Sequence, residues 1–244
     1  MTHKFTQCFI LAVSALGLSA LPALADSPCT PGPLSTYVDS LYGGTAAPDF
    51  SCSVTAGGAT LDFSDFTYNT AGTNPVAVGN VGVTIATSPD GPGLEFDPDA
   101  TITGANLSSD VNVGFTVTAE NGALISDVYL AFDGVFVQNG GTASLTEQFC
   151  DLVGACSTQI EDPLTALSDN FLLSSTALGG PVSSLVITKD LQLTTSGAAG
   201  SQSMDSGFKN EYSAVPEPRS ISLILTVGLL AGFAFFKRRQ VTQS

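Results

Sequence analysis

Residues 111–118 alternate apolar and polar side chains one by one. The apolar positions are Val111, Val113, Phe115 and Val117, and the positions between them hold Asn, Gly or Thr. Successive side chains of a β-strand point to opposite faces of its sheet, so this period of two predicts a strand with one buried face. The part of the chain around this stretch is therefore expected to be mainly antiparallel β-structure.

Shorter stretches of the same character recur along the chain. They lie at 61–63, 81–85, 128–132, 135–137 and 185–193. Asn121-Gly122 and Asn139-Gly140-Gly141 lie between some of them, and Asn and Gly adopt the positive φ of tight hairpin turns at low cost. Many short strands separated by turn signals predict a single antiparallel β-sandwich, with a jelly roll as one version.

Short helices are predicted beside the strands. Apolar side chains recur at helical spacing in 33–42, with a proline at the start and two glycines directly after the end. Ser144 and Glu147 have the spacing of a capping box, which predicts a short helix leading into Cys150. A further helix is expected over 164–173.

The N-terminus has the order of a secretory signal. Lys4 is followed by an apolar stretch over 8–20, and the small residues Ala23 and Ala25 place the cleavage before Asp26. The apolar stretch is short for a membrane span and ends in a cleavage pattern. We therefore expect residues 1–25 to be removed as a signal peptide.

A second apolar segment, 221–236, contains no charged residue and is followed at once by Lys237, Arg238 and Arg239. Sixteen residues at about 1.5 Å each reach about 24 Å, somewhat less than a hydrocarbon core of about 30 Å, so local thinning or flanking residues must make up the difference. The three cations place the C-terminal end in the cytoplasm. The segment predicts a transmembrane helix that leaves 26–218 outside.

Val215, Pro216, Glu217 and Pro218 precede this helix. Together, 215–239 resemble the PEP-CTERM sorting signal, which consists of a Pro-Glu-Pro tripeptide, a transmembrane helix and a basic terminus. The resemblance implies export through the inner membrane of a Gram-negative-type bacterium. It also implies an exosortase, an integral-membrane processing enzyme, as partner. Removal of the anchor would then pass the protein to the cell surface or the exopolysaccharide matrix.

Between these ends, 26–193 are expected to form the extracytoplasmic domain, and 194–214, rich in Gly, Ser and Ala, a flexible linker. From 26 to 214 the chain has 21 carboxylates against two lysines, Lys189 and Lys209, a net charge of −19. Such a surface repels nucleic acid and anionic lipid, and it is compatible with cations or neutral polysaccharide.

Four cysteines remain after signal removal, namely Cys29, Cys52, Cys150 and Cys156. An even number in an oxidising compartment predicts two disulfides, for which three connectivities exist. Proximity in the sequence favours Cys29 with Cys52 and Cys150 with Cys156.

Catalytic residue types are scarce in the exported part. The single histidine, His3, leaves with the signal, and no arginine lies between 26 and 218. This composition argues against a Ser-His-Asp site, a His-based metal site and bidentate phosphate recognition. A glycoside hydrolase needs two carboxylates facing each other across a cleft. In a domain with 21 acidic residues, the presence of two carboxylates is not specific evidence for such an enzyme.

One acidic cluster has the residue types of a Ca²⁺ site, in a stretch rich in Pro and Gly that is expected to be a loop. Its members are Asp90, Glu95, Asp97 and Asp99. No other cofactor is expected. The sequence favours a non-catalytic surface or matrix protein, with a Ca²⁺- or glycan-binding module as the alternative and a polysaccharide hydrolase as the minority hypothesis.

Overall fold

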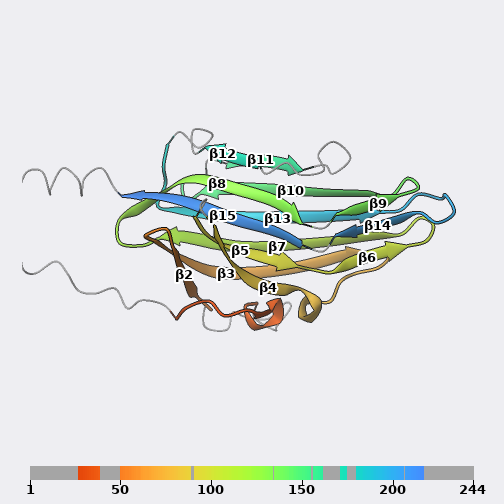
Figure 1. Ribbon diagram of the computed structural model, residues 1–244, viewed down its shortest axis with the longest axis horizontal. Coiled ribbons are helices and arrows are strands. Elements are labelled where there is room, and N and C mark those ends of the chain that lie inside the picture. Colours follow the sequence, from red (N-terminus) through yellow and green to blue (C-terminus); the bar gives the residue numbers. More distant parts are fainter. Residues whose placement is uncertain are drawn as a thin grey trace, which may run out of the picture.

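The computed structural model describes residues 27–38, 50–88, 91–133, 135–154, 156–161, 171–174, 180–205 and 207–216 (Figure 1). The predicted signal peptide and the predicted helix over 221–236 lie outside these residues. None of the helices within the described ranges has the length and apolar character needed to cross a membrane.

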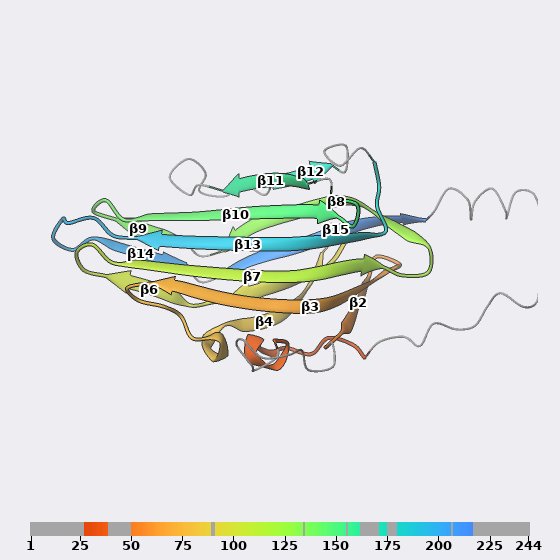
Figure 2. The same cartoon turned by 180° about the vertical axis from the view of Figure 1, so that it is seen from behind.

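Two six-stranded antiparallel sheets form the body of the molecule. The back sheet contains, in order, β11 (Cys156–Glu161), β10 (Thr142–Asp151), β13 (Ser184–Thr194), β7 (Ser108–Ala119), β3 (Ala59–Gly72) and β2 (Cys52–Ala56). The front sheet contains, in order, β1 (Gly32–Pro33), β4 (Gly82–Ser88), β5 (Gly91–Asp97), β15 (Gly207–Pro216), β8 (Ala123–Asp133) and β12 (Phe171–Ser174). Figure 1 shows the front sheet facing the viewer, and Figure 2 shows the back sheet.

A third sheet, here called the tip sheet, prolongs the front sheet at one end of the molecule (Figure 1). Its strands, in order, are β6 (Ala100–Thr103), β14 (Gln202–Asp205) and β9 (Phe136–Gln138). Each is separated from its counterpart in the front sheet, β5, β15 or β8, by one or two residues, and the order is the same. The tip sheet is therefore the continuation of three interrupted strands.

The core lies between the inner faces of the front and back sheets, as expected for a sandwich. The four apolar positions of β7 are buried, which confirms the strand predicted from the alternation. Phe96 of the front sheet stacks on Phe115 of β7 and on Phe208 of β15, each with ring centroids 5.6 Å apart. The Phe96–Phe115 contact joins the two sheets.

The two predicted Asn-Gly turns are confirmed. Asn121 and Gly122 have φ of 57° and 72°, and Asn139 and Gly140 have φ of 51° and 78°. They connect β7 to β8 and β9 to β10. Two consecutive residues at positive φ give a turn that matches the twist of the flanking strands.

The predicted linker over 194–214 is wrong. This stretch contains β14 and most of β15, and β15 pairs with β5 on one side and β8 on the other. Phe208 and Tyr212 are fully buried in the core. The strand alternation was hidden because the inward position between them holds a polar residue, Asn210. The domain therefore continues to Pro216.

The predicted helices were also largely wrong. Ser144 and Glu147 lie in β10, because Ala143, Leu145 and Phe149 alternate with polar residues and enter the core. Of 33–42 the structure describes 33–38, where only Leu34–Thr36 forms a 3₁₀ helix, η1. Of 164–173 it describes 171–173, which belong to β12. A second 3₁₀ helix, η2, spans Val78–Asn80.

Candidate functional site

The outer face of the tip sheet, called the tip face, carries a row of uncharged side chains. Phe136 of β9 is 44% exposed, a large fraction for an aromatic ring in a strand. Phe136 pairs with Met204 and Met204 with Thr101, so these three side chains lie side by side across the sheet. The next row outward from this one contains Gln138, Gln202 and Thr103.

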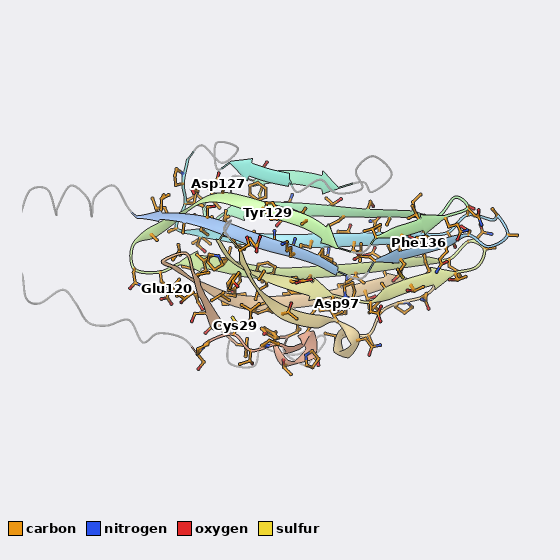
Figure 3. The ribbon with its side chains drawn as sticks, in the orientation of Figure 1. Cys29, Asp97, Glu120, Asp127, Tyr129 and Phe136 are labelled. Carbon is orange, nitrogen blue, oxygen red and sulfur yellow. A yellow bond between two sulfur atoms is a disulfide. The ribbon has the colours of Figure 1, made fainter. Side chains whose placement is uncertain are left out.

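Strand alternation places these side chains outside. The residues between them, Val137, Ser203 and Ile102, point inward, where Ile102 and Ser203 are fully buried. The Ser203 hydroxyl donates a hydrogen bond to the carbonyl of Thr142 at 2.6 Å, which ties β14 to β10. The tip face therefore rests on a buried inner layer that is hydrogen-bonded to β10. Figure 3 shows Phe136 near the end of the molecule.

The chemistry of the tip face differs from that of the acidic domain around it. It combines one aromatic ring with two carboxamides, two hydroxyls and a thioether. Carboxamides and hydroxyls both donate and accept hydrogen bonds, as sugar hydroxyls require. An exposed aromatic ring offers an apolar surface on which the C–H face of a sugar can pack. The surface is suited to a neutral, hydroxyl-rich ligand.

The outer face of the front sheet is charged instead. The Glu211 carboxylate accepts a hydrogen bond from Ser88 at 2.9 Å and lies 3.7 Å from the Lys209 ammonium. Lys209 in turn lies 5.7 Å from the centroid of the Tyr129 ring. Glu211 is fully buried, so this group is a structural network across β4, β15 and β8 rather than an open site.

Of the four residues predicted for Ca²⁺, the structure describes Glu95, Asp97 and Asp99. Glu95 lies within β5 and accepts a hydrogen bond from Thr84, Asp97 ends β5, and Asp99 connects β5 to β6 with φ of 42°. Asp90 lies outside the described residues. The expected loop is therefore wrong over 91–97, which form a strand. Within the described part of the chain, no three acidic, His or Cys side chains are grouped closely enough to hold a metal.

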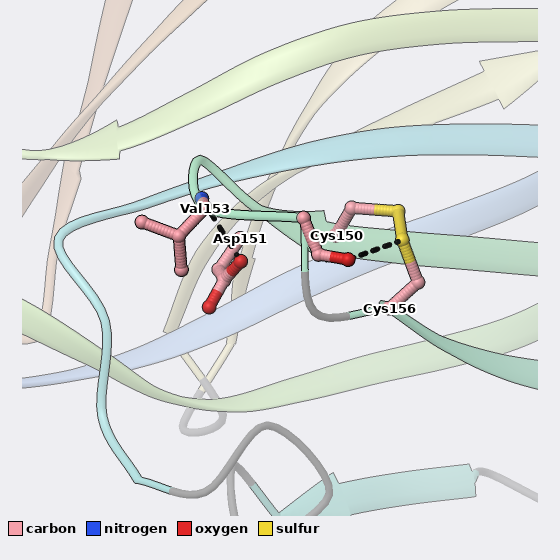
Figure 4. The surroundings of a disulfide bond; sticks show 5 residues. Cys150, Asp151, Val153 and Cys156 are labelled. Carbon is pink, nitrogen blue, oxygen red and sulfur yellow. Dashed lines mark hydrogen bonds between the residues drawn. A yellow bond between two sulfur atoms is a disulfide. The ribbon is translucent and has the colours of Figure 1, made fainter.

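Both disulfides favoured by the sequence are present. Cys29 pairs with Cys52, and Cys150 pairs with Cys156. Figure 4 shows the second, which closes the turn between β10 and β11, where the Val153 amide donates to the Asp151 carboxylate at 3.0 Å. Disulfides persist in oxidising compartments, so they indicate an extracellular or periplasmic protein.

Only the start of the predicted sorting motif is described. Val215 and Pro216 are the last residues of β15, opposite Leu124 and Ala123 of β8. Glu217, Pro218, Lys237, Arg238 and Arg239 lie outside the described residues, as do Ala23, Ala25 and Asp26 at the predicted signal cleavage. β15 thus runs directly to the motif.

The core contains a polar cluster that the sequence did not predict. Glu147 of β10, Lys189 of β13 and Asn210 of β15 are fully buried. The Glu147 carboxylate is 3.7 Å from the Lys189 ammonium and accepts a hydrogen bond from the Asn210 amide at 2.8 Å. A signal for it exists in the sequence, because each of the three occupies an inward position of an alternating strand. Lys189, for example, stands between the buried Ile187 and Leu191.

Burial shifts the acid–base equilibria of this cluster. Desolvation lowers the pKa of Lys189 to about 8, although the neighbouring Glu147 carboxylate opposes the shift. Desolvation also raises the pKa of Glu147, against the opposing effects of Lys189 and Asn210. The pKa of Tyr212 is raised by burial and by the charge of Glu147. In each case burial shifts the acid–base equilibrium toward the neutral form of the side chain.

No protein-family model and no curated protein sequence matches the chain. Among solved structures it is similar to TmCBM61 in complex with β-1,4-galactotriose, at 14% identity and a TM-score of 0.30, over 62% of this chain and 88% of the other. It is also similar to the enzymatically active domain of bacteriophage CBA120 tailspike protein 4, at 13% identity and a TM-score of 0.23, over 62% and 19%. A third is a family two carbohydrate esterase from Cellvibrio japonicus, at 9% identity and a TM-score of 0.20, over 63% and 36%. These likenesses are too low to carry an argument about fold or function.

Proposed function

We propose that this chain is an exported, non-catalytic protein of the cell surface or extracellular matrix, and that its tip face binds neutral polysaccharide. The observation that carries the proposal is the row of Phe136, Met204 and Thr101 beside the row of Gln138, Gln202 and Thr103. A half-exposed aromatic ring flanked by carboxamides and hydroxyls, with no charge among them, has the composition that a neutral sugar chain requires.

The position of the tip face supports this role. β15 begins next to the tip sheet and ends with Pro216 at the opposite end of the molecule (Figure 1). If the chain continues from Pro216 into an anchor over 221–236, the tip face is the part of the domain farthest from the membrane. It would then be presented to polysaccharide outside the cell.

The sorting segment belongs to the same proposal. The order of 215–218, 221–236 and 237–239 supports an exosortase-type enzyme as processing partner, followed by transfer to the cell surface or the exopolysaccharide matrix. A domain with a net charge of −19 over 26–214 is repelled by anionic polymers, so a neutral matrix polysaccharide is the compatible ligand.

A non-catalytic role fits the burial of the core lysine and glutamate. Lys189 and Glu147, whose pKa values are clearly shifted, are fully buried and face the core rather than a substrate. The tip face itself contains no carboxylate, whereas glycoside hydrolysis needs a pair of them beside the scissile bond.

Binding to a panel of polysaccharides tests the proposal. The full chain should bind at least one neutral polysaccharide, such as a galactan or a glucan, and should not bind an anionic one such as alginate. Phe136→Ala should weaken binding about fivefold, since one aromatic contact contributes on the order of 1 kcal/mol. Calorimetry or affinity electrophoresis measures the binding of the unmodified chain and of the Phe136→Ala variant.

A matched control is Val186→Ala, which removes a side chain that is 41% exposed on the back sheet, away from the tip face. It should leave binding unchanged. Equal weakening by the two substitutions, or no binding of the unmodified chain to any neutral polysaccharide, would contradict the proposed role of the tip face.

A further inference from the structure

The buried cluster brings together an amine, a carboxamide and a carboxyl group at the centre of the sandwich. Lys189 lies on β13 of the back sheet, and Glu147 is its directly paired neighbour on β10. Asn210 reaches them from β15, a central strand of the front sheet. All three are fully buried.

The geometry places the amine and the carboxamide against the same carboxyl oxygen. Glu147 Oε1 accepts a hydrogen bond from Asn210 Nδ2 at 2.8 Å and lies 3.7 Å from Lys189 Nζ. Asn210 Nδ2 also donates to the carbonyl of Tyr129 at 3.1 Å, which fixes the orientation of the amide. Lys189 Nζ lies 5.3 Å from the ring centroid of Phe208, two residues before Asn210 on the same face of β15.

If Lys189 and Glu147 remained an ion pair, the hydrogen-bonding capacity of this cluster would be poorly satisfied. In the cluster and the adjoining Tyr212, four buried polar atoms have no hydrogen-bond partner among the described residues, namely Lys189 Nζ, Glu147 Oε2, Asn210 Oδ1 and Tyr212 OH. Buried polar groups in folded proteins are almost always hydrogen-bonded, and a buried charge without hydrogen bonds is costly. A cluster whose members react with one another removes part of this cost.

We propose that Lys189 and Asn210 condense to an intramolecular amide bond, with Glu147 as the acid–base group. The bond joins Lys189 Nζ to Asn210 Cγ and releases one molecule of ammonia. The adjacent carboxyl oxygen is within reach of both the nitrogen that attacks and the nitrogen that leaves.

The environment shifts Lys189 and Glu147 toward their reactive, uncharged forms. Burial lowers the pKa of Lys189 and raises that of Glu147. Passing one proton from the ammonium to the carboxylate therefore yields a neutral amine, which is the nucleophile, and a carboxylic acid, which can protonate a leaving nitrogen. Enclosure among Phe208 and other apolar side chains also excludes water, the competing nucleophile.

The reaction balances without an oxidant or a co-reactant. The electron pair of Lys189 Nζ attacks Asn210 Cγ, and the carbonyl electrons move to Oδ1. Glu147 gives its proton to Nδ2 and takes one from Nζ. The bond between Cγ and Nδ2 breaks, ammonia leaves with the bonding pair, and the carbonyl forms again. Glu147 ends protonated, as it began.

The bond would link the two sheets covalently at their centres. β13 and β15 are both interior strands, and β15 is the last strand before the predicted anchor. A pulling force applied through Pro216 would pass from Asn210 to Lys189, and so into the back sheet, without unfolding 190–209. This consequence suits a matrix protein, but the chemistry does not depend on the tip face binding polysaccharide.

Peptide mapping tests the bond directly. The full chain is exported to the periplasm of a bacterial host, purified in folded form, and digested with a protease that cuts after Asp and Glu. The sequence predicts fragments 170–190 and 206–211, which contain Lys189 and Asn210 and no cysteine.

We expect these two fragments as one linked species, whose mass is that of both fragments less one ammonia. Two separate fragments of unaltered mass would overturn the proposal, and so would loss of ammonia confined to 206–211.

Substitutions identify the atoms involved. Asn210→Asp should still link but lose water in place of ammonia, because the leaving group becomes a hydroxyl. Lys189→Met and Glu147→Gln should give separate fragments. Lys209→Met is the matched control, since Lys209 lies on the opposite face of β15 and its loss should leave the linked species intact. Linkage in Glu147→Gln would overturn the role assigned to Glu147, and linkage in Lys189→Met would overturn that of Lys189.

Discussion

Individual buried tyrosines differ in whether their hydroxyl is satisfied. The Tyr68 hydroxyl donates a hydrogen bond to the carbonyl of Val76 at 2.7 Å. The Tyr212 hydroxyl is buried without a hydrogen-bond partner. A buried hydroxyl without a partner has lost its hydrogen bonds to water and formed none in the protein, so it opposes folding. A buried hydroxyl that forms a hydrogen bond supports folding.

The two corresponding phenylalanine variants should therefore behave differently. Tyr68→Phe should lower the free energy of unfolding by about 1 kcal/mol, the typical value of one hydrogen bond. Tyr212→Phe should leave it unchanged or raise it. Denaturant unfolding of the two variants measures both values, and a larger loss for Tyr212→Phe would contradict the expectation.

At the scale of elements, the two disulfides differ in how much the attachment of the segment that each one closes depends on it. Cys150 and Cys156 are directly paired residues of the β10–β11 hairpin, so hydrogen bonds already hold that turn together. Cys29 lies in the described segment 27–38, whose backbone is joined to the sheets by the two-residue strand β1, a bridge between Pro28 and Ser53 and a few loop hydrogen bonds, and whose Leu34 and Tyr37 side chains are buried in the core.

Removal of the Cys29–Cys52 disulfide should therefore cost more stability than removal of Cys150–Cys156. The sequence separations are 23 and 6 residues. Loop-closure entropy then gives about 3.4 and about 2.2 kcal/mol, respectively. Thermal unfolding of the double serine variants checks the order, and an equal or reversed order would show that the segment around Cys29 is held mainly by other contacts.

At the scale of the whole molecule, the last strand completes the fold. β15 separates β5 from β8, and without it the front sheet loses the pairing of its two halves. Its side chains Phe208 and Tyr212 are among the largest that are fully buried. The stretch that composition marks as a linker is thus part of the core.

A chain ending at 194 should consequently fail to fold, whereas a chain ending at 216 should fold. The shorter chain exposes the apolar inner face of the back sheet and two unpaired strand edges, so we expect it to aggregate or to remain sensitive to proteolysis. Circular dichroism and limited proteolysis compare the two, and cooperative unfolding of the shorter chain would restore the linker interpretation.

The sequence by itself determined the features that depend on near neighbours. Alternation in 111–118 and 185–193 predicted strands, because side-chain direction in a strand has a fixed period of two. The two Asn-Gly pairs predicted their turns, because few residues accept positive φ. Proximity of the cysteines predicted the disulfide pairing, and all of these are confirmed.

Only the tertiary structure decided which polar residues belong inside. Asn210 interrupted the apolar alternation of a central strand, and Glu147 suggested a helix cap. Both predictions failed because a polar residue is expected to be exposed when only its sequence neighbours are considered. Both face inward. Lys189 lies beside Glu147, Glu147 accepts a hydrogen bond from Asn210, and these contacts compensate part of the burial cost. Strand order and the tip face likewise depend on which distant segments pair, and sequence pattern does not record such contacts.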